Sequence, residues 1–345
     1  MSAPADARVA GLSVVVAGAG SIGRRHLRNL RDLGVGRLAA CDPDPARRKA
    51  VADELGVAAL AGLDEALDAG PPDAVLVCSP PVSHVSQALR AVDRGAHVFV
   101  EKPLAHSLAG VEELAARARA AARAVQVGYN LRFHPGIRQL KGLVDAGAVG
   151  RVLWLHGEFG FDLREWRPGR DYRTNYSARA DLGGGIILDA SHEIDYVLWL
   201  LGQPTEVVCM AGKVSGLEMD VADCATVLLR FPGGGPADGP KADIHMDCVQ
   251  RVRRRACRIA GTEGTLVWDY DAREIQVFRA ARKQWERLPY RFEENDMYVA
   301  ELRHFLDCVL GRATPLVGLD EGRRALAVAL AAQTAARERR VERLA

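Results

Sequence analysis

The chain lacks the features that mark membrane-spanning and nucleic-acid-binding proteins. No apolar run reaches the length of a membrane span, which argues against an integral membrane protein. The net charge is only +2, from 46 basic and 44 acidic side chains. Nothing in this balance favours nucleic acid or an anionic membrane as a partner. Internal repeats and long low-complexity segments are also missing.

The chain also lacks a Cys-x-x-Cys motif. Its seven cysteines are odd in number and scattered, and several lie in apolar runs. We therefore predict reduced structural thiols of a cytoplasmic protein, with neither a disulfide framework nor a metal site. The seven are Cys41, Cys78, Cys209, Cys224, Cys248, Cys257 and Cys308.

Length and composition indicate a globular protein of two domains. The 345 residues exceed what one core usually serves, and 48% are hydrophobic against 26% charged. Residues 1–11 lack the apolar core of a secretory signal, and we expect a disordered lead-in there.

A glycine-rich turn organises the first part of the chain. The apolar run 14–17 ends in Gly18-Ala19-Gly20-Ser21-Ile22-Gly23, and a helical pattern continues to residue 33. Strand, turn and helix in this order are typical of dinucleotide binding, although an ordinary tight turn is the simpler alternative. Gly18 permits the turn, Gly20 lets a pyrophosphate approach the backbone, and Gly23 lets helix and strand pack closely. Ser21 and Ile22 then present free N–H groups at the helix start.

An acidic residue ends the second predicted strand, residues 37–41. Asp42 follows Gly23 by 19 residues, where a carboxylate holds the ribose hydroxyls of NAD and repels the extra phosphate of NADP. We therefore predict NAD as the cofactor. Arg47 and Arg48 leave NADP open, because they could reach a 2′-phosphate.

Strand and helix patterns alternate through the first third of the chain. Helices are predicted at 45–55, 63–69, 85–93 and 107–123, and strands at 57–60, 74–78, 97–100 and 125–127. The order predicts an α/β fold that begins with a doubly wound parallel sheet, a Rossmann domain over residues 1–124.

The pattern then changes to that of an α+β domain over residues 125–345. Period-two segments separated by turns predict a large, mostly antiparallel open sheet. Its strands are expected at 151–159, 205–214, 224–231, 242–249, 254–259, 265–269 and 274–278. Helices are expected at 135–146, 186–201, 298–310 and 320–343.

Two motifs lie at predicted strand ends, where ligands bind in parallel sheets. Ser79-Pro80-Pro81-x-x-His84 should line the nicotinamide side of the cofactor, although His84 could equally be a surface residue of the next helix. In Glu101-Lys102-Pro103 the Lys102 ammonium could stabilise charge that develops on a substrate oxygen. The alternative is a solvated lysine paired with Glu101.

A third motif begins the apolar helix at 186–201. Three glycines precede Asp189 and His192, which are three residues apart and so share one helix face. A buried carboxylate beside an imidazole fixes its tautomer and supports its charged form, as a general base requires. The alternative is a structural His–Asp hydrogen bond.

Together, the glycine turn, Ser-Pro-Pro-x-x-His, Glu-Lys-Pro and the Gly-Gly-Gly…Asp…His helix resemble the Gfo/Idh/MocA family over nearly the whole chain. The resemblance implies NAD(P)-dependent oxidation or reduction of a sugar or cyclitol hydroxyl, with Lys102, Asp189 and His192 as catalytic residues. It also implies an open sheet that commonly mediates contacts in homodimers or homotetramers. Many members space the Asp and His four residues apart, where this chain has three. The amino-acid sequence of residues 129–135 most resembles the branch found in surface-polysaccharide and amino-sugar loci.

Further residues are candidates for the substrate. Asn130 and Arg132 directly follow the first domain and are polar for an interior crossover. The arm at residues 161–180 combines five arginines with aromatic residues, which suits a sugar with an anionic group. Mutual neutralisation of the charges in a solvated or subunit-contacting loop is the alternative. From this arm we select Tyr172, Tyr176 and Arg179.

The sequence thus predicts a dehydrogenase of a sugar, amino sugar, nucleotide sugar or cyclitol. His192 takes the hydroxyl proton, Lys102 stabilises the oxyanion, and Ser79, Pro80, His84 and Glu101 join the glycine turn and Asp42 around the cofactor. One alternative is an NAD-retaining glycosidase or lyase, which some family members are, and the other is a non-catalytic dinucleotide sensor.

Overall fold

The computed structural model describes residues 6–233 and 238–344. The chain forms two compact units, Met1–Asn130 with Glu294–Arg323, and Leu131–Glu293 with Arg324–Ala345. Our prediction placed a single boundary after residue 124. In the structure the chain crosses between units after Asn130, after Glu293 and after Arg323.

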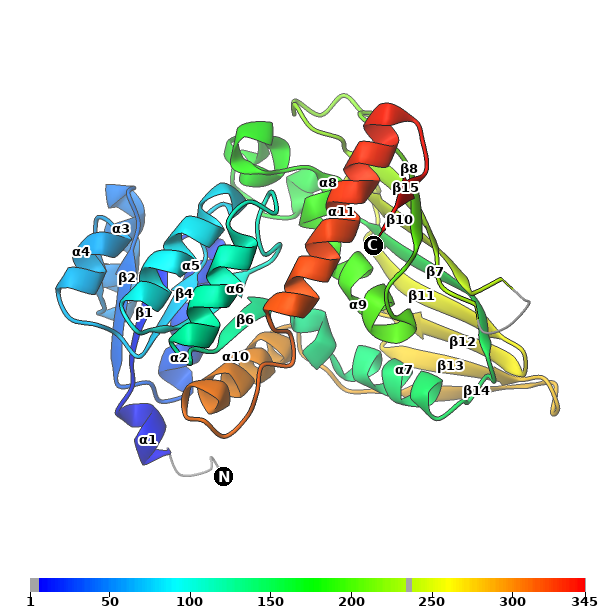
Figure 1. The fold of residues 1–345 in the computed structure, drawn as a ribbon, viewed down its shortest axis with the longest axis horizontal. Coiled ribbons are helices and arrows are strands. Elements are labelled where there is room, and N and C mark those ends of the chain that lie inside the picture. The colour runs from blue at the N-terminus through cyan, green and yellow to red at the C-terminus, as the bar shows by residue number, and fades with distance from the viewer. Residues whose placement is uncertain (1–5, 234–237, 345) are drawn as a thin grey trace. The chain divides into compact units, whose positions relative to one another are not determined.

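The first unit contains a six-stranded parallel sheet in the order β3-β2-β1-β4-β5-β6 (Figure 1). This order confirms the predicted Rossmann fold. The strands are β1 Ser13–Ala17, β2 Arg37–Cys41, β3 Ala58–Leu60, β4 Ala74–Val77, β5 His97–Glu101 and β6 Val125–Gly128. The helices are α1 Ala7–Ala10, α2 Ser21–Asp32, α3 Pro45–Leu55, α4 Leu63–Asp68, α5 His84–Asp93, α6 Val111–Ala120, α10 Asp296–Val309 and the start of α11 Leu319–Glu338.

Two local expectations in this unit were wrong. The helix predicted at 107–123 is shorter, because Gly110 has a left-handed φ of +75° before α6 and Ala122 has a positive φ after it. The predicted lead-in contains a helical turn, α1, which Asp6 caps by accepting a hydrogen bond from Arg8 N. Residues 1–5 lie outside the described residues.

Helix α10 packs into the core of the first unit despite its distance in sequence. Its apolar residues Leu302, Phe305 and Leu306 share one buried cluster with β1, β4 and α2. The ring of Phe305 lies edge-on to Phe99 of β5, with 5.6 Å between ring centroids. This burial explains why Glu294–Arg323 belongs to the first unit.

The second unit contains a nine-stranded sheet in the order β14-β13-β12-β11-β7-β10-β9-β8-β15 (Figure 1). All neighbouring pairs are antiparallel except β7 and β10, which confirms the predicted mostly antiparallel sheet. The strands are β7 Val152–Gly160, β8 Glu206–Gly212, β9 Cys224–Arg230, β10 Lys241–Asp247, β11 Arg254–Gly261, β12 Gly264–Asp269, β13 Glu274–Arg279, β14 Gln284–Pro289 and β15 Glu342–Arg343. We did not predict β14 or β15. The helix predicted at 320–343 ends at Glu338, because Arg339 has a positive φ, and residues 342–343 form β15 instead.

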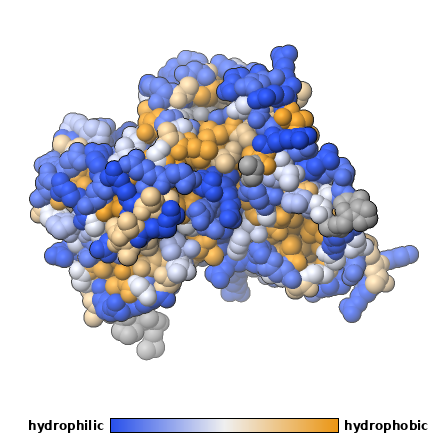
Figure 2. Space-filling view, in the orientation of Figure 1, coloured by the Kyte–Doolittle hydropathy of each residue, from blue (hydrophilic) through white to orange (hydrophobic). Residues whose placement is uncertain are grey.

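Helices α7 Pro135–Asp145, α8 Ile186–Asp189 and α9 Ser191–Leu201 pack on one face of this sheet. The contact is close, since a Cβ at Gly136 of α7 would lie 2.4 Å from Trp268 Nε1 of β12. Alternate side chains point to the opposite face, where Met210 is 83% exposed. In the view of Figure 2, hydrophilic residues cover most of the surface and apolar areas lie between them.

The helix predicted at 186–201 is interrupted. Ala190 has a ψ of +22°, outside the helical range, and separates α8 from α9. Asp189 therefore ends one helix, whereas His192 lies in the first turn of the next.

Candidate functional site

The glycine turn of the first unit can accommodate a dinucleotide. Gly18 has a φ of +104°, and a Cβ there would lie 2.6 Å from the carbonyl oxygen of Cys78. A Cβ at Gly23 would lie 1.8 Å from the oxygen of Gly18, so this position also excludes a side chain. A Cβ at Gly20, by contrast, would meet no described atom within 4 Å. Backbone packing therefore requires glycine at positions 18 and 23, whereas Gly20 leaves open space at the start of α2, where phosphates bind.

Helix α2 starts without a side-chain cap. Gly20 is the N-cap residue, and Ser21 and Ile22 are the first two helical residues. The first N–H groups of a helix have no partner inside it, and the helix dipole places positive charge there. This end of α2 can therefore receive the cofactor's pyrophosphate.

Asp42 connects the end of β2 to the glycine turn. Its carboxylate is 3% exposed and accepts hydrogen bonds from the backbone N–H groups of Ala19, at 2.8 Å, and Asp44, at 2.9 Å. Arg47 lies 3.6 Å from the same carboxylate, and Arg48 donates to the Asp42 carbonyl at 2.8 Å. The carboxylate predicted to bind the ribose is thus rigidly held, and the guanidinium of Arg47 partly balances its charge.

The Ser-Pro-Pro loop follows β4 at the same edge of the sheet. Ser79 Oγ donates to Gln87 at 2.8 Å, and Pro80 leads into the short turn η1, Pro81–Ser83. His84 is buried, not a surface residue, and its Nδ1 and Nε2 lie 2.9 and 2.8 Å from the carbonyl oxygens of Pro103 and Ser79. Burial lowers the pKa of His84, against the effect of these two carbonyls. The ring therefore connects the loops that follow β4 and β5.

Glu101 ends β5, and Lys102 follows it. Glu101 is 8% exposed; one carboxylate oxygen lies 2.6 Å from His26 Nε2, and the other accepts from the backbone N–H of Lys102 at 3.1 Å. The carboxyl ends of parallel strands share one edge of a sheet. The glycine turn, Ser79 and Lys102 therefore line the same edge of the first unit.

The second unit carries Asp189 and His192, both largely buried. Tyr176 belongs to the turn η5, Tyr176–Ala178, and its hydroxyl donates to Asp189 Oδ1 at 2.5 Å. A Cβ at Gly184 would lie 1.9 Å from the carbonyl oxygen of Tyr176, so this glycine allows the arm to approach the start of α8. The structure thus brings the predicted substrate residue Tyr176 to the predicted catalytic carboxylate.

Asn130 and Arg132 are both buried, at 4% and 5% exposure. Asn130 hydrogen-bonds the hydroxyl of Tyr298. The guanidinium of Arg132 donates two hydrogen bonds to Asp195, and its charge also lies 5.4 Å from the ring of Trp199. The Arg132 guanidinium is therefore already hydrogen-bonded to a carboxylate inside the protein.

Most arginines of the arm are paired with acidic residues close to them. Arg164 pairs with Asp162, Arg173 with Asp171 and Glu218, and Arg179 with Asp181. These arginines hold the pKa values of the three aspartates below their ordinary range. The pairing agrees with mutual neutralisation and weakens the case for an anionic group on the substrate.

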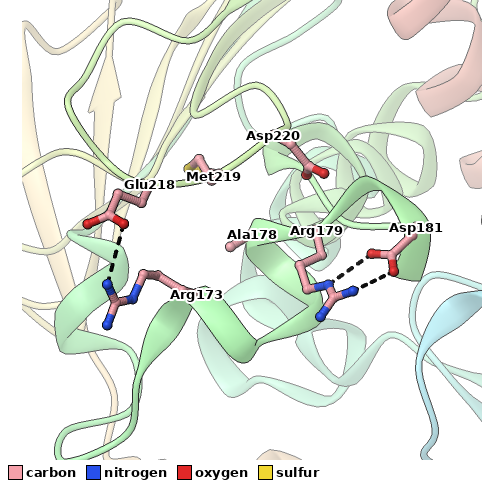
Figure 3. Close-up of a pocket in the computed structure, with 7 residues that line it drawn as sticks. All are labelled: Arg173, Ala178, Arg179, Asp181, Glu218, Met219 and Asp220. Carbon is pink, nitrogen blue, oxygen red and sulfur yellow. Dashed lines mark hydrogen bonds and ion pairs between the residues drawn. The ribbon is translucent and has the colours of Figure 1, made fainter.

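A surface pocket of about 510 Å³ lies beside this arm (Figure 3). It is lined by Arg173, Ala178, Arg179, Asp181, Glu218, Met219 and Asp220, and both arginines point to carboxylates of the same lining. Tyr172 is anchored nearby, because its hydroxyl accepts from the backbone N–H of Glu218 at 3.0 Å. Arg179 thus lines this pocket and Tyr172 contacts the lining residue Glu218, whereas Tyr176 contacts Asp189.

Two residues that we did not single out lie close to the lysine motif. His26 contacts Glu101 from α2, and Tyr298 of α10 packs on His26 with 6.2 Å between ring centroids. The sequence did contain a sign of His26, because this polar residue lies on the buried face of α2 with Leu27 and Leu30. In the part of the chain that the structure describes, no group of three or more His, Cys, Asp and Glu side chains could hold a metal ion.

Two family models match most of the chain. The first, an oxidoreductase family with an NAD-binding Rossmann fold (GFO/IDH/MocA), matches residues 12–129. The second, the GFO/IDH/MocA C-terminal domain, matches residues 137–267.

Named relatives and solved structures agree with these models. The chain is 27% identical to scyllo-inositol 2-dehydrogenase (NAD(+)) of Bacillus subtilis, over 88% of this chain and 87% of that protein. It is 31% identical to inositol 2-dehydrogenase of Burkholderia ambifaria, over 86% of each. A levoglucosan dehydrogenase in complex with NADH shares the fold, with a TM-score of 0.85 and 19% identity over 97% of this chain and 99% of the other.

The fold also occurs in the WlbA dehydrogenase of Bordetella pertussis, solved with NADH and UDP-GlcNAcA. The TM-score is 0.80, and the identity is 20% over 97% of this chain and 99% of the other. At such identities the structures show the fold alone. The family models, the relatives and the glycine turn agree: the chain belongs to the GFO/IDH/MocA family of oxidoreductases with an NAD-binding Rossmann fold.

Proposed function

We propose that the protein is an NAD-dependent dehydrogenase that oxidises a secondary hydroxyl of a cyclitol or sugar, with inositols as the first candidates. The observation that carries this proposal is the shared edge of the parallel sheet. The open space at Gly20 lies after β1 and Lys102 lies after β5, and only β4 separates these two strands. The substrate class is supported by the relatives from Bacillus subtilis and Burkholderia ambifaria, which are named inositol dehydrogenases.

The first unit would hold the cofactor. Gly18, Gly20 and Gly23 shape the turn, α2 offers its N–H groups to the pyrophosphate, and Asp42 accepts from the ribose hydroxyls. When bound, NAD supplies the electron-pair acceptor for the oxidation of an alcohol carbon.

The acid–base chemistry is assigned to three side chains. Lys102 donates a hydrogen bond to the reacting oxygen and stabilises the negative charge that develops on it. His192 accepts the hydroxyl proton, and Asp189 supports the charged imidazole. Tyr176 is our preferred substrate-facing residue of the arm, because its hydroxyl already contacts Asp189.

Amino sugars or nucleotide sugars are the second candidate substrates, since motif wording favours that branch and the WlbA dehydrogenase was solved with UDP-GlcNAcA. The five arginines of the arm agree with such a substrate, whereas the internal pairing of three of them, Arg164, Arg173 and Arg179, does not. The relatives' names favour net oxidation over an NAD-retaining lyase or glycosidase. A sensor would need neither Lys102 nor the Asp189–His192 pair.

We also propose a homo-oligomer in the cytoplasm, with no nucleic acid or membrane partner. The seven thiols are unpaired, which suits a reducing compartment. No helix in the described part of the chain is both long and apolar enough to cross a bilayer. Exposed apolar residues on the open sheet face, such as Met210 and Leu228, suit a contact between copies.

The test is nicotinamide absorbance with NAD and with NADP against a panel of inositols, free sugars, sugar phosphates and nucleotide sugars. We expect reduction of NAD by one substrate class, and a roughly 10²- to 10³-fold lower kcat for Lys102→Ala. Lys49→Ala, a surface lysine paired with Asp53, serves as the matched control. The absence of any signal, together with NAD that stays bound through purification, would contradict net oxidation and favour the NAD-retaining alternative.

A further inference from the structure

Two buried histidines hold the segment Glu101-Lys102-Pro103 from its two ends. His26 is fully buried in α2, and its Nε2 lies 2.6 Å from the carboxylate of Glu101. His84 is 1% exposed at the start of α5, and its Nδ1 lies 2.9 Å from the carbonyl oxygen of Pro103. Lys102 lies between these two anchored residues.

The imidazole of His26 has little freedom to turn. Phe99 and Tyr298 lie edge-on to it, with centroid distances of 5.3 and 6.2 Å. Glu101 is the hydrogen-bond partner of Nε2, whereas Nδ1 is buried without a partner in the described structure. A carboxylate only accepts, so the nitrogen that faces it carries the proton.

Glu101 passes this restraint on to the lysine. Its second carboxylate oxygen accepts from the backbone N–H of Lys102 at 3.1 Å, so one side chain fixes both a helix and the next residue's backbone. Both oxygens are engaged by the protein. The sequence predicts a direct contact of Glu101 with the cofactor, whereas these two hydrogen bonds favour a supporting role.

His84 restrains the other end and connects a further loop. Its Nε2 lies 2.8 Å from the carbonyl oxygen of Ser79, in the loop after β4. The lysine segment is thereby in contact with both neighbouring parts of this edge of the sheet: through His26 with the helix of the glycine turn, and through His84 with the Ser-Pro-Pro loop. Because carbonyl oxygens only accept, the neutral His84 ring donates to one of its two carbonyls at a time.

We propose that His26 and His84 are positioning residues that, with Glu101, set the place of Lys102 relative to the cofactor loops. The proposal rests on the function proposed above, in which Lys102 contacts the reacting oxygen. Misplacing a catalytic group by about 1 Å can cost roughly 10²-fold in rate, so such restraints matter for turnover more than for binding.

The test compares kcat, KM and the dissociation constant of NAD for Glu101→Gln, His26→Gln and His84→Gln. Glu101→Gln retains shape and volume but loses the charge, so it carries the test even if a histidine variant does not fold. We expect kcat to fall roughly 10- to 100-fold, while the NAD dissociation constant changes less than about twofold. General loss of structure would instead impair NAD binding and turnover together.

His97→Gln is the matched control, because His97 lies at the opposite end of β5 and its Nδ1 accepts from the backbone N–H of Ala124. It should retain wild-type kcat. Lys102→Ala is measured alongside. If Lys102→Ala is inactive but Glu101→Gln and a folded histidine variant turn over normally, the positioning role is wrong and the proposed function stands. If Lys102→Ala is fully active, the role of the lysine itself fails, and the positioning role with it.

Discussion

Arg132 and Asp195 face each other inside the second unit through two parallel hydrogen bonds. Arg132 Nε lies 2.9 Å from Asp195 Oδ2, and its terminal nitrogen lies 2.8 Å from Oδ1. Their side chains are 6% and 1% exposed. Loss of one partner from such a buried pair leaves an uncompensated charge, whereas replacement of both by apolar groups can cost little.

We therefore expect Asp195→Ala to lower the free energy of unfolding by about 3–5 kcal/mol, measured by urea denaturation. The double variant Arg132→Met with Asp195→Leu should lose clearly less. Asp53→Ala, in the exposed pair with Lys49, is the control and should leave stability almost unchanged. If Asp195→Ala is as stable as this control, the pair is not structural and Arg132 is again a candidate for the substrate.

Asp42 should determine the preference for NAD over NADP. Because its carboxylate is the buried negative charge beside the glycine turn, Asp42→Ala should lower the ratio of kcat/KM for NAD to that for NADP by about tenfold or more. Asp44→Ala is the control, since Asp44 lies only two residues after Asp42 but serves as the N-cap of α3. An unchanged ratio in Asp42→Ala would remove Asp42 from cofactor selection.

The contact between Tyr176 and Asp189 should matter for turnover. Tyr176→Phe removes only the hydroxyl that donates to the carboxylate at 2.5 Å. A hydrogen bond to a charged group is worth about 1.5–3 kcal/mol, so kcat/KM should fall roughly 10- to 100-fold. Tyr172→Phe is the comparison, and we expect a smaller loss because that hydroxyl accepts from the backbone N–H of Glu218. Equal effects of the two variants would contradict a special role for Tyr176.

His134 should make the stability of the protein depend on pH. Its Nδ1 accepts from the N–H groups of Gly136 and Ile137 at the start of α7. Burial, and then the charge of Arg255, lower the pKa of His134 from 6.5 to about 3. Between these values the unfolded chain binds a proton that the folded protein excludes. Stability is therefore lost as the pH falls from 6.5 towards 3, by about 1.4 kcal/mol per pH unit.

The measurement is the free energy of unfolding at pH 7 and pH 5 for the wild type and for His134→Asn. Asparagine can retain the cap but does not titrate. The loss of stability between the two pH values should be about 2 kcal/mol smaller in the variant. Identical losses would show that other groups cause the acid sensitivity.

The predictable parts of the fold were those with strong local patterns. Buried parallel strands such as β4 read as continuous apolar runs, and α3 begins with an Asp44 cap and Pro45, so both were located closely. Strand β14 was missed because it is an exposed edge strand, Gln284–Pro289, without alternation. The break at Ala190 was missed because alanine favours helix, and nothing local marks it.

The candidate site was predictable in its residues but not in their contacts. The glycine turn, the lysine motif and the Asp–His pair were visible as patterns. Arg132 binds Asp195, which lies 63 residues further on, and Tyr176 binds Asp189, which lies 13 residues further on. Only the fold brings these pairs together. Likewise, the motif suggested a cofactor contact for Glu101, whereas its partner His26 lies 75 residues earlier.

The return of α10 to the first unit has a consequence for the order of events during synthesis. A ribosome releases residues 1–130 long before Leu302, Phe305 and Leu306, which complete the buried cluster of that unit. Until they arrive, the nascent Rossmann sheet exposes apolar side chains of α2, β1 and β4. The dinucleotide-binding unit is thus completed late in translation, although it begins first, and the interval in which its apolar side chains stay exposed spans the synthesis of β7 to β14.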